Sequence, residues 1–319
     1  MDLAQASTAY RGELLAHCYR MLGSVHDAED LVQETMLRAW RFAGGYDESR
    51  GSVRTWLHRI ATNACLSHLE GRQRRVLPVD LNGPCQLPDV ENVDEHLEIP
   101  WLEPFPDALI PTADPSTVIE VRESIRLAFI AALQLLPPRQ RAVLILRDVL
   151  AMPAAEVAAL LEMTVVSVNS ALQRARVHIA EASPSADDAG LVQPSDSESQ
   201  DLLDRYMAAF TTMDVEALTG TLREDALLQM PPFPQWFLGR DAIGEFLITA
   251  FARGGSFRCV QTRANGQLAV GVYRRRNSDV HRFLHVQLLT MTPTGIARID
   301  AFHVPDFYGR LGLPEVLAN

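Results

Sequence analysis

Two proline- and acid-rich connectors constrain the fold of this 319-residue chain more than any other feature. Eight prolines lie between Val76 and Thr117, and residues 76–121 contain ten acidic residues and no arginine. Proline lacks a backbone donor and blocks helix propagation, and the acids favour solvation, so no continuous helix is expected here. Ser183–Ser199 is rich in Ser, Asp, Pro and Gly, as flexible linkers are. We therefore predict domains at 1–75, 119–182 and 199–319, joined by linkers at 76–118 and 183–198.

The net charge of −11 argues at first against a nucleic-acid partner, but its distribution does not. The acidic excess lies in the two connectors. Residues 1–75 contain ten arginines against nine acids, and residues 122–181 contain seven against five. Because charge acts locally on a nucleic acid, these two mildly basic modules remain compatible with DNA binding.

The segment 153–176 favours a helix-turn-helix. Apolar residues at spacings of three and four predict one helix from Ala154 to Leu161 and a second from Val165 to about Ile179. The opposite face of the second helix carries side chains that can contact base edges and phosphates in a major groove, namely Ser167, Asn169, Ser170, Gln173 and Arg174. The alternative is an ordinary helical hairpin with a solvated face.

The N-terminal module is predicted to be helical throughout. Apolar spacing predicts a helix at Arg11–Leu22, a second helix opened by the acidic turn His26–Asp30, and a third from about Ser52 to the arginines at 72–75. Acidic residues in a first turn favour the helix dipole. Glycines at Gly23 and at 44–45 separate these helices.

Four motifs follow one another in the chain: DAEDLVQET at 27–35, WLHRIATN at 56–63, LPPRQR at 136–141 and SALQRAR at 170–176. Together they resemble the extracytoplasmic-function (ECF) sigma factors of bacterial RNA polymerase, over about residues 8–75 and 119–180. The resemblance implies two all-α sigma domains, the second with the helix-turn-helix, that direct promoter recognition and transcription initiation without catalytic activity of their own. A conventional helix-turn-helix repressor or activator is the alternative, but it leaves the first motif unexplained.

The resemblance also implies roles for individual residues. The family binds core RNA polymerase through its β′ clamp helices and its β flap, and the residues expected on the clamp helices are Asp30, Leu31, Gln33 and Glu34; a capped helix with a solvated acidic face is the plainer explanation of the acids. At the −10 element, Tyr46 and Asn63 are expected to hold a flipped base, with phosphates bound by Arg72, Arg74 and Arg75. At the −35 element, the expected residues are Arg141, Ser167, Asn169, Ser170, Gln173, Arg174 and Arg176.

The first connector has an apolar stretch, Ile99–Pro106, that contains Trp101 and Phe105. Solvated tethers rarely carry such residues. We therefore expect a docked segment, on the polymerase, where the family threads this region through the enzyme, or on this protein's own domains.

The C-terminal domain is predicted to be α+β. Helices are expected at Ser199–Met213, Val215–Leu222 and Asp241–Phe251, followed by strands at Phe257–Ala264, Gln267–Arg275, His281–Met291 and Ile296–His303. This order, with WFLGRDAI at 236–243 before the third helix, resembles the SnoaL-like fold of polyketide cyclases, a cone around an apolar pocket. Its covalent fusion to the sigma modules through a short acidic linker favours a built-in regulator of the sigma domains.

Candidate pocket residues are Trp236, His285, Gln287, Asp300 and His303. Side chains two apart on a strand share a face, so His285 and Gln287 should lie together, whereas Asp300 and His303 should point to opposite faces. Structural or ligand-sensing roles are preferred to proton transfer. The alternative function is a bifunctional protein whose pocket binds or converts a small molecule.

Four cysteines, Cys18, Cys65, Cys85 and Cys259, have no metal-ligand spacing, so neither a metal nor a cofactor is expected. No apolar run is long enough for a membrane span and no signal peptide is recognised. We therefore expect a cytoplasmic protein.

Overall fold

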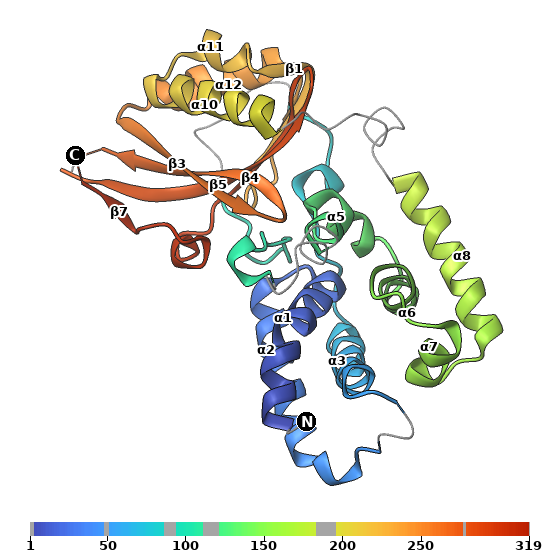
Figure 1. Cartoon of the computed structure of the whole chain (residues 1–319). Coiled ribbons are helices and arrows are strands. Elements are labelled where there is room, and N and C mark those ends of the chain that lie inside the picture. The colour runs from blue at the N-terminus through green and yellow to red at the C-terminus, as the bar shows by residue number, and fades with distance from the viewer. Residues whose placement is uncertain are drawn as a thin grey trace. The chain divides into compact units, whose positions relative to one another are not determined.

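A computed structural model describes residues 3–47, 51–85, 94–110, 121–182, 196–276 and 279–318. The chain divides into two compact units (Figure 1). The first unit contains residues 1–75, 102–105 and 109–184, and the second contains residues 76–101, 106–108 and 185–319. Most of the predicted second linker, at residues 183–195, lies outside the described residues.

Three helices form the N-terminal half of the first unit: α1 (Leu3–Leu22), α2 (Val25–Arg41) and α3 (Val53–Leu69). The Ser24 hydroxyl accepts a 3.0 Å hydrogen bond from the backbone N–H of Asp27 and so caps α2. A short 3₁₀ turn, Ala43–Gly45, follows α2. The helix α3 ends at Leu69, before the arginine cluster that was predicted to belong to it, and Gly71 follows with a positive φ of 72°.

The second half of this unit is also helical. It contains α5 (Leu127–Gln134), α6 (Pro138–Leu144), a π-helical turn η5 (Ile145–Val149), α7 (Ala154–Leu161) and α8 (Val165–Ala182). Between α7 and α8, Glu162 adopts the left-handed conformation, and the two helices meet at 99°, a sharp bend visible in Figure 1. The predicted helix-turn-helix is thus present at the predicted residues.

Part of the first connector is docked on this unit. Leu102 and Phe105 are buried, and the ring of Phe105 lies 4.7 Å from that of Tyr19 in α1. At Gly23 the chain turns with a φ of 70°, and an added Cβ would lie 2.5 Å from the Leu102 side chain. Glycine therefore allows both the turn and the close approach of the connector.

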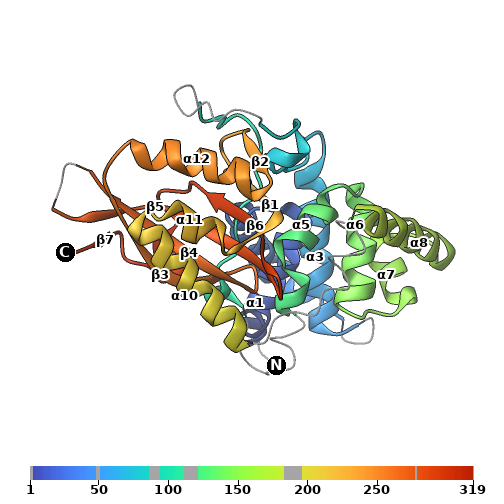
Figure 2. The ribbon, with the colours of Figure 1, turned by 90° about the horizontal axis from the view of Figure 1, so that it is seen from above.

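The second unit is a sheet covered on one face by α10 (Asp196–Thr212), α11 (Val215–Thr219) and α12 (Arg240–Ala252), as Figures 1 and 2 show from two directions. The strand order is β2-β1-β6-β5-β4-β3, with β7 paired to β5. The strands are β1 (Leu222–Gln229), β2 (Trp236–Leu238), β3 (Ser256–Ala264), β4 (Gln267–Arg275), β5 (His281–Thr292), β6 (Gly295–Phe302) and β7 (Val316–Leu317). All neighbours are antiparallel except β1 and β6.

Connector residues complete this unit. The backbone N–H of Cys85 donates to the carbonyl of Trp236 at 2.8 Å, and the indole N–H of Trp236 donates to the carbonyl of Asn82 at 2.9 Å. Asp107, in the 3₁₀ turn η4 (Asp107–Leu109), accepts a 2.8 Å hydrogen bond from the N–H of Gly266. These connector residues are therefore docked rather than freely solvated.

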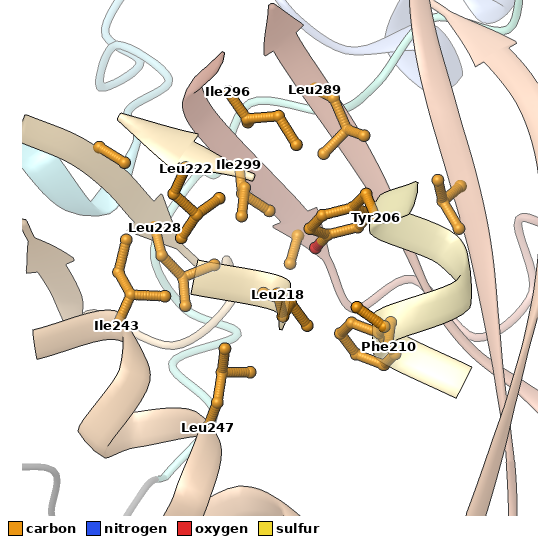
Figure 3. Close-up of a cluster of buried hydrophobic side chains, with 14 of the residues drawn as sticks. Tyr206, Phe210, Leu218, Leu222, Leu228, Ile243, Leu247, Leu289, Ile296 and Ile299 are labelled. Carbon is orange, nitrogen blue, oxygen red and sulfur yellow. The ribbon is translucent and has the colours of Figure 1, made fainter. Parts of the chain in front are cut away.

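The core of the second unit is an apolar cluster between the three helices and the sheet. Figure 3 shows side chains from α10, α11, α12 and the strands gathered there, including Tyr206, Phe210, Leu218, Ile243, Leu247 and Ile299. This is the predicted α+β cone.

Among the described residues, no single helix combines the length and apolar content needed to cross a membrane; α7 and α8 reach that composition only when taken together across their bend.

Candidate nucleic-acid interface and C-terminal pocket

The helix α8 separates cleanly into a buried and an exposed face. Val168, Leu172 and Ala175 are buried, which fixes the helix against its own unit. The polar residues predicted to read DNA lie on the other side: Ser167, Asn169, Gln173 and Arg174 are exposed, and Ser170 is half-buried. Before the helix, the Thr164 hydroxyl accepts a 3.1 Å hydrogen bond from the N–H of Ser167, which caps its first turn. A fixed helix with amides, hydroxyls and a guanidinium on its free face can contact base edges.

Arg176 is exposed but has a partner within its own unit. Its Nε and Nη2 donate to the two carboxylate oxygens of Asp148, at 2.8 and 2.7 Å. These hydrogen bonds, together with the Asp148 charge, raise the pKa of Arg176. The carboxylate of Asp148 thus neutralises the positive charge of Arg176 in the absence of DNA.

Arg141 does not occupy the position expected of a phosphate ligand. It is only 2 % exposed, and its guanidinium donates to the Gln134 side-chain oxygen at 2.6 Å and to the carbonyls of Met21, Gln134 and Leu136. Burial lowers its pKa to about 10. This placement does not fit the predicted DNA contact, because Arg141 donates to carbonyl groups at the ends of α1 and α5.

The acidic face of α2, predicted to contact the polymerase, is only partly exposed to solvent. Asp30 and Gln33 are exposed, whereas Glu34 is half-buried and pairs with Arg38 one turn later at 2.5 Å. Leu31 is only 6 % exposed, so the apolar polymerase contact predicted for it does not fit this structure. Its helical spacing with Ala28, Val32 and Thr35 places it in the core.

The candidate base-holding residues lie at the two ends of a helix–loop segment. The ring of Tyr46 is half-buried and lies 5.3 Å from that of Trp56, tilted by 46°, and its hydroxyl donates to the carbonyl of Gly51 at 3.2 Å. Asn63 is exposed on α3. An aromatic face and a free amide are the two groups that an unstacked base requires.

The three arginines after α3 differ in how freely their side chains could contact DNA phosphates. Arg72 and Arg74 are exposed. Arg75 is half-buried and pairs with Asp27 at 2.6 Å and with Glu103 at 3.5 Å. Partial burial raises the pKa of Asp27, but the hydrogen bond and charge of Arg75, with the charges of His68 and Arg72, outweigh it and hold that pKa below its ordinary value. Arg75 is therefore committed to the fold of the first unit.

The second unit contains a partly open cavity of about 220 Å³ between α10, α12 and the sheet. His285, Gln287 and His303 line it as predicted, with His285 and Gln287 on one face of β5. Trp236 and Asp300 do not line it. Asp300 is buried on the other face of β6, where it accepts hydrogen bonds from Gln229 and from Arg298 Nε at 2.8 Å. The Asp–His pair considered for proton transfer is thus not assembled.

The polar residues of the cavity form a chain. The Tyr206 hydroxyl donates to Gln287 Oε1 at 2.9 Å, and Gln287 Nε2 lies 3.0 Å from His285 Nε2. The rings of His285 and His303 lie 4.5 Å apart. Burial lowers the pKa of His285 well below its ordinary value, with a smaller effect of the charge on His303, and burial lowers the pKa of His303 to about 4. Both imidazoles are therefore neutral near pH 7.

The sequence reasoning missed Tyr206, Arg253 and Arg274 as cavity residues. Arg253 directly follows α12 and Arg274 lies on β4, and the β3–β4 hairpin, in which Ser256 pairs with Arg275, brings these two segments together.

Three family models match the chain: Sigma-70 region 2 at residues 7–75, Sigma-70, region 4 at residues 126–179 and a SnoaL-like domain at residues 203–307. The ECF RNA polymerase sigma factor SigG of Mycobacterium tuberculosis is 48% identical over 99% of this chain and 85% of its own length. The factor SigJ of the same organism is 27% identical over 77% of this chain and 72% of its own length. The crystal structure of SigJ matches 98% of this chain and 100% of that chain with a TM-score of 0.63 at 22% identity.

Proposed function

The chain belongs to the extracytoplasmic-function (ECF) sigma factors of RNA polymerase. From this premise we propose which of its side chains contact promoter DNA and which contact the polymerase. It directs promoter recognition and transcription initiation by binding core RNA polymerase and promoter DNA, and it carries a SnoaL-like C-terminal domain. Because sigma factors act on RNA polymerase, we place its site of action in the cytoplasm.

The exposed polar face of α8 carries the proposal for the −35 element. Asn169 and Gln173 have amides that can pair with adenine edges, and Arg174 can pair with guanine. Ser167 and Ser170 add hydroxyls near the start of the helix. Arg176 contributes to phosphate binding only after it leaves Asp148, and Arg141 has no direct DNA role.

The test is transcription by core RNA polymerase reconstituted with the full chain. The promoter is first identified by initiation on genomic fragments. Asn169→Ala and Arg174→Ala should then each cost about tenfold or more in −35 binding and relax the base preference at one position. Arg240→Ala is a matched control, because Arg240 is in the SnoaL-like domain, has an exposed side chain and makes only a 3.4 Å pair with Glu224. If both α8 variants kept the wild-type base preference, the proposal that the exposed face of α8 recognises the −35 element would be rejected.

For the −10 element we propose Tyr46 and Asn63 as the base-holding pair, with Arg72 and Arg74 on phosphates. The exposure of Asn63, Arg72 and Arg74 supports these roles. Phosphate contacts should weaken binding to all sequences alike. Arg72→Ala and Arg74→Ala should each lower the slope of log affinity against log salt by about 1, whereas Asn63→Ala should leave that slope unchanged.

For the polymerase we propose the exposed face of α2, with Asp30, Gln33 and Glu34 as the contacting side chains. Asp30→Arg reverses a charge on this face without touching the core. It should weaken comigration with core polymerase in gel filtration, while Glu162→Arg, an exposed reversal in the helix-turn-helix turn, should not. Equal comigration of both variants would reject this surface.

We also propose that the SnoaL-like domain regulates the sigma domains. Its covalent attachment to them and its cavity support this role. The chain ending at residue 182 should differ from the full chain in promoter-directed transcription. Equal activity of the two would reject the regulatory role but not the sigma function.

A further inference from the structure

The cavity of the SnoaL-like domain has a size that suits one small ligand. Its volume of about 220 Å³ exceeds the about 150 Å³ of an apolar cavity that binds benzene, and is below the about 300 Å³ typical of drug-sized ligands. Most of its wall is apolar and comes from α10, α12 and the sheet; Tyr206, Phe210, Ile243 and Leu247 are seen in Figure 3. A ligand should therefore have an apolar body of one or two rings.

His285, which lines the cavity, carries a hydrogen-bond donor that has no partner among the described residues. Tyr206 donates to Gln287 Oε1, so the amide nitrogen of Gln287 faces His285 Nε2. An amide nitrogen only donates, so His285 Nε2 accepts, and the proton of the neutral imidazole is on Nδ1. The Nδ1 atom is buried and has no hydrogen-bond partner among the described residues. Such a donor is costly unless an acceptor is supplied.

Another part of the wall offers positive charge. Arg253 and Arg274 both line the cavity, and no carboxylate lies within ion-pair distance of either one in the part of the chain that the structure describes. Arg274 donates to the carbonyl of Gly254 at 2.7 Å, and its guanidinium lies 5.3 Å from the centre of the Phe257 ring, which fixes its position. Its Nε is buried and has no partner. Two unneutralised guanidinium groups favour an anion.

The sheet sets the separation between the backbone positions that carry the donor and the charge. On β4, Val272 pairs with His285 and Arg274 pairs with Arg282. Arg274 is therefore two residues along β4 from the position opposite His285, which is about 7 Å at the usual rise per residue. No Asp or Glu lines the cavity between them. The arrangement is that of a binding site for a molecule with an anion at one end and a neutral oxygen acceptor at the other.

We propose that the SnoaL-like domain is a receptor for a small carboxylic acid with an apolar, ring-containing body and a second, uncharged oxygen that accepts a hydrogen bond. The carboxylate pairs with Arg253 and Arg274, and the second oxygen accepts from His285. The binding stands independently of the sigma function, whereas its effect on transcription rests on the regulatory role proposed above.

The probe is 6-methoxy-2-naphthoate, which has the carboxylate, the two rings and the distal ether oxygen. Isothermal titration calorimetry with the full chain at pH 7.5 should show one saturable site. Its neutral amide, 6-methoxy-2-naphthamide, should bind about tenfold weaker or worse, because the charge-assisted pair is lost. The same loss is expected for Arg274→Met. For 2-naphthoate, which lacks the ether oxygen, a smaller loss of about threefold or more is expected.

Arg240→Met is the matched control, since Arg240 lies outside the cavity wall and removing it deletes the same charge. Tyr206→Phe provides a second variant that keeps the apolar volume and breaks the chain that orients His285; it should weaken the naphthoate but not abolish its preference over the amide. Thermal unfolding of each variant verifies folding. Absence of saturable binding, or equal affinity for acid and amide in the wild type, would overturn the proposal. Binding without any change in promoter-directed transcription would leave the receptor intact and reject the regulatory link alone.

Discussion

Glu103 in the first connector caps the helix that begins at Val25: its Oε2 accepts a 3.0 Å hydrogen bond from the backbone N–H of Val25. The same oxygen accepts from the N–H of His26 at 3.3 Å and lies 2.9 Å from its Nδ1. The carboxylate thus occupies the positive end of the α2 dipole, 77 and 78 residues away in the chain. The connector is in this way part of the first unit's fold.

Replacing Glu103 by Gln should therefore destabilise the protein. The substitution removes the charge at the start of α2 and its pair with Arg75, and we expect a loss of roughly 1 kcal/mol in the free energy of unfolding. Denaturant unfolding measures it. Glu98→Gln is the control, because Glu98 is an exposed connector carboxylate whose ion pair is with nearby His96. Equal stability of the two variants would show that the cap is energetically unimportant.

A second prediction concerns Arg141. Arg141→Leu keeps an apolar stem but leaves the carbonyls of Met21, Gln134 and Leu136 without their donor inside the first unit. Burying these groups unpaired should cost on the order of 2–3 kcal/mol of unfolding free energy. Arg139→Leu, two residues earlier and exposed, should cost little. If Arg141→Leu instead kept full stability and lost only DNA affinity, the phosphate role would have to be restored.

The helices and the helix-turn-helix were predictable because their apolar residues repeat at three and four positions, as Val168, Leu172 and Ala175 do on α8. The sequence did not predict strand β1. Its alternation of apolar and polar residues is interrupted by three consecutive charged residues, Arg223, Glu224 and Asp225. The shared face of His285 and Gln287 was predictable because residues two apart on a strand point the same way. The opposite orientation of Asp300 and His303 was predictable because they are three apart.

Other features depend on contacts that a single sequence does not specify. The motif at 136–141 predicts that Arg141 contacts DNA. Its burial depends instead on the carbonyl groups of α1 and α5 that accept hydrogen bonds from it. The apolar connector stretch indicates docking, yet only the fold shows Leu102 against Gly23 and Phe105 against Tyr19. Likewise, Arg253 and Arg274 share the cavity because the antiparallel β3–β4 hairpin pairs Ser256 with Arg275 and so returns the chain to the end of α12.

The lowered pKa values of the cavity histidines predict a pH dependence of stability. His303 has a folded pKa of about 4 against an ordinary value of 6.5, so the unfolded state binds its proton first as pH falls. Stability from this group is fully present above pH 6.5 and is lost between pH 6.5 and 4, with a slope of at most about 1.4 kcal/mol per pH unit. His303→Gln should flatten the curve of unfolding free energy in this window.

His178→Gln is the comparison for that measurement, because His178 is exposed on α8. It should leave the slope between pH 6.5 and 4 as in the wild type. A slope that is the same in all three proteins would mean that His303 is solvated and titrates normally.

The pair between Arg176 and Asp148 predicts a gain of function. Both carboxylate oxygens of Asp148 hold the Arg176 guanidinium, and both residues are exposed beside the proposed DNA-reading face. Asp148→Asn removes a charge that repels phosphate and releases Arg176 to bind it, so affinity for −35 DNA should rise by about twofold to tenfold at low salt and converge with the wild type at high salt. Fluorescence anisotropy over a salt series measures this. In an Arg176→Ala background the same substitution should give a smaller gain, because only the repulsion remains to be removed; an undiminished gain would show that Arg176 does not bind phosphate even when released.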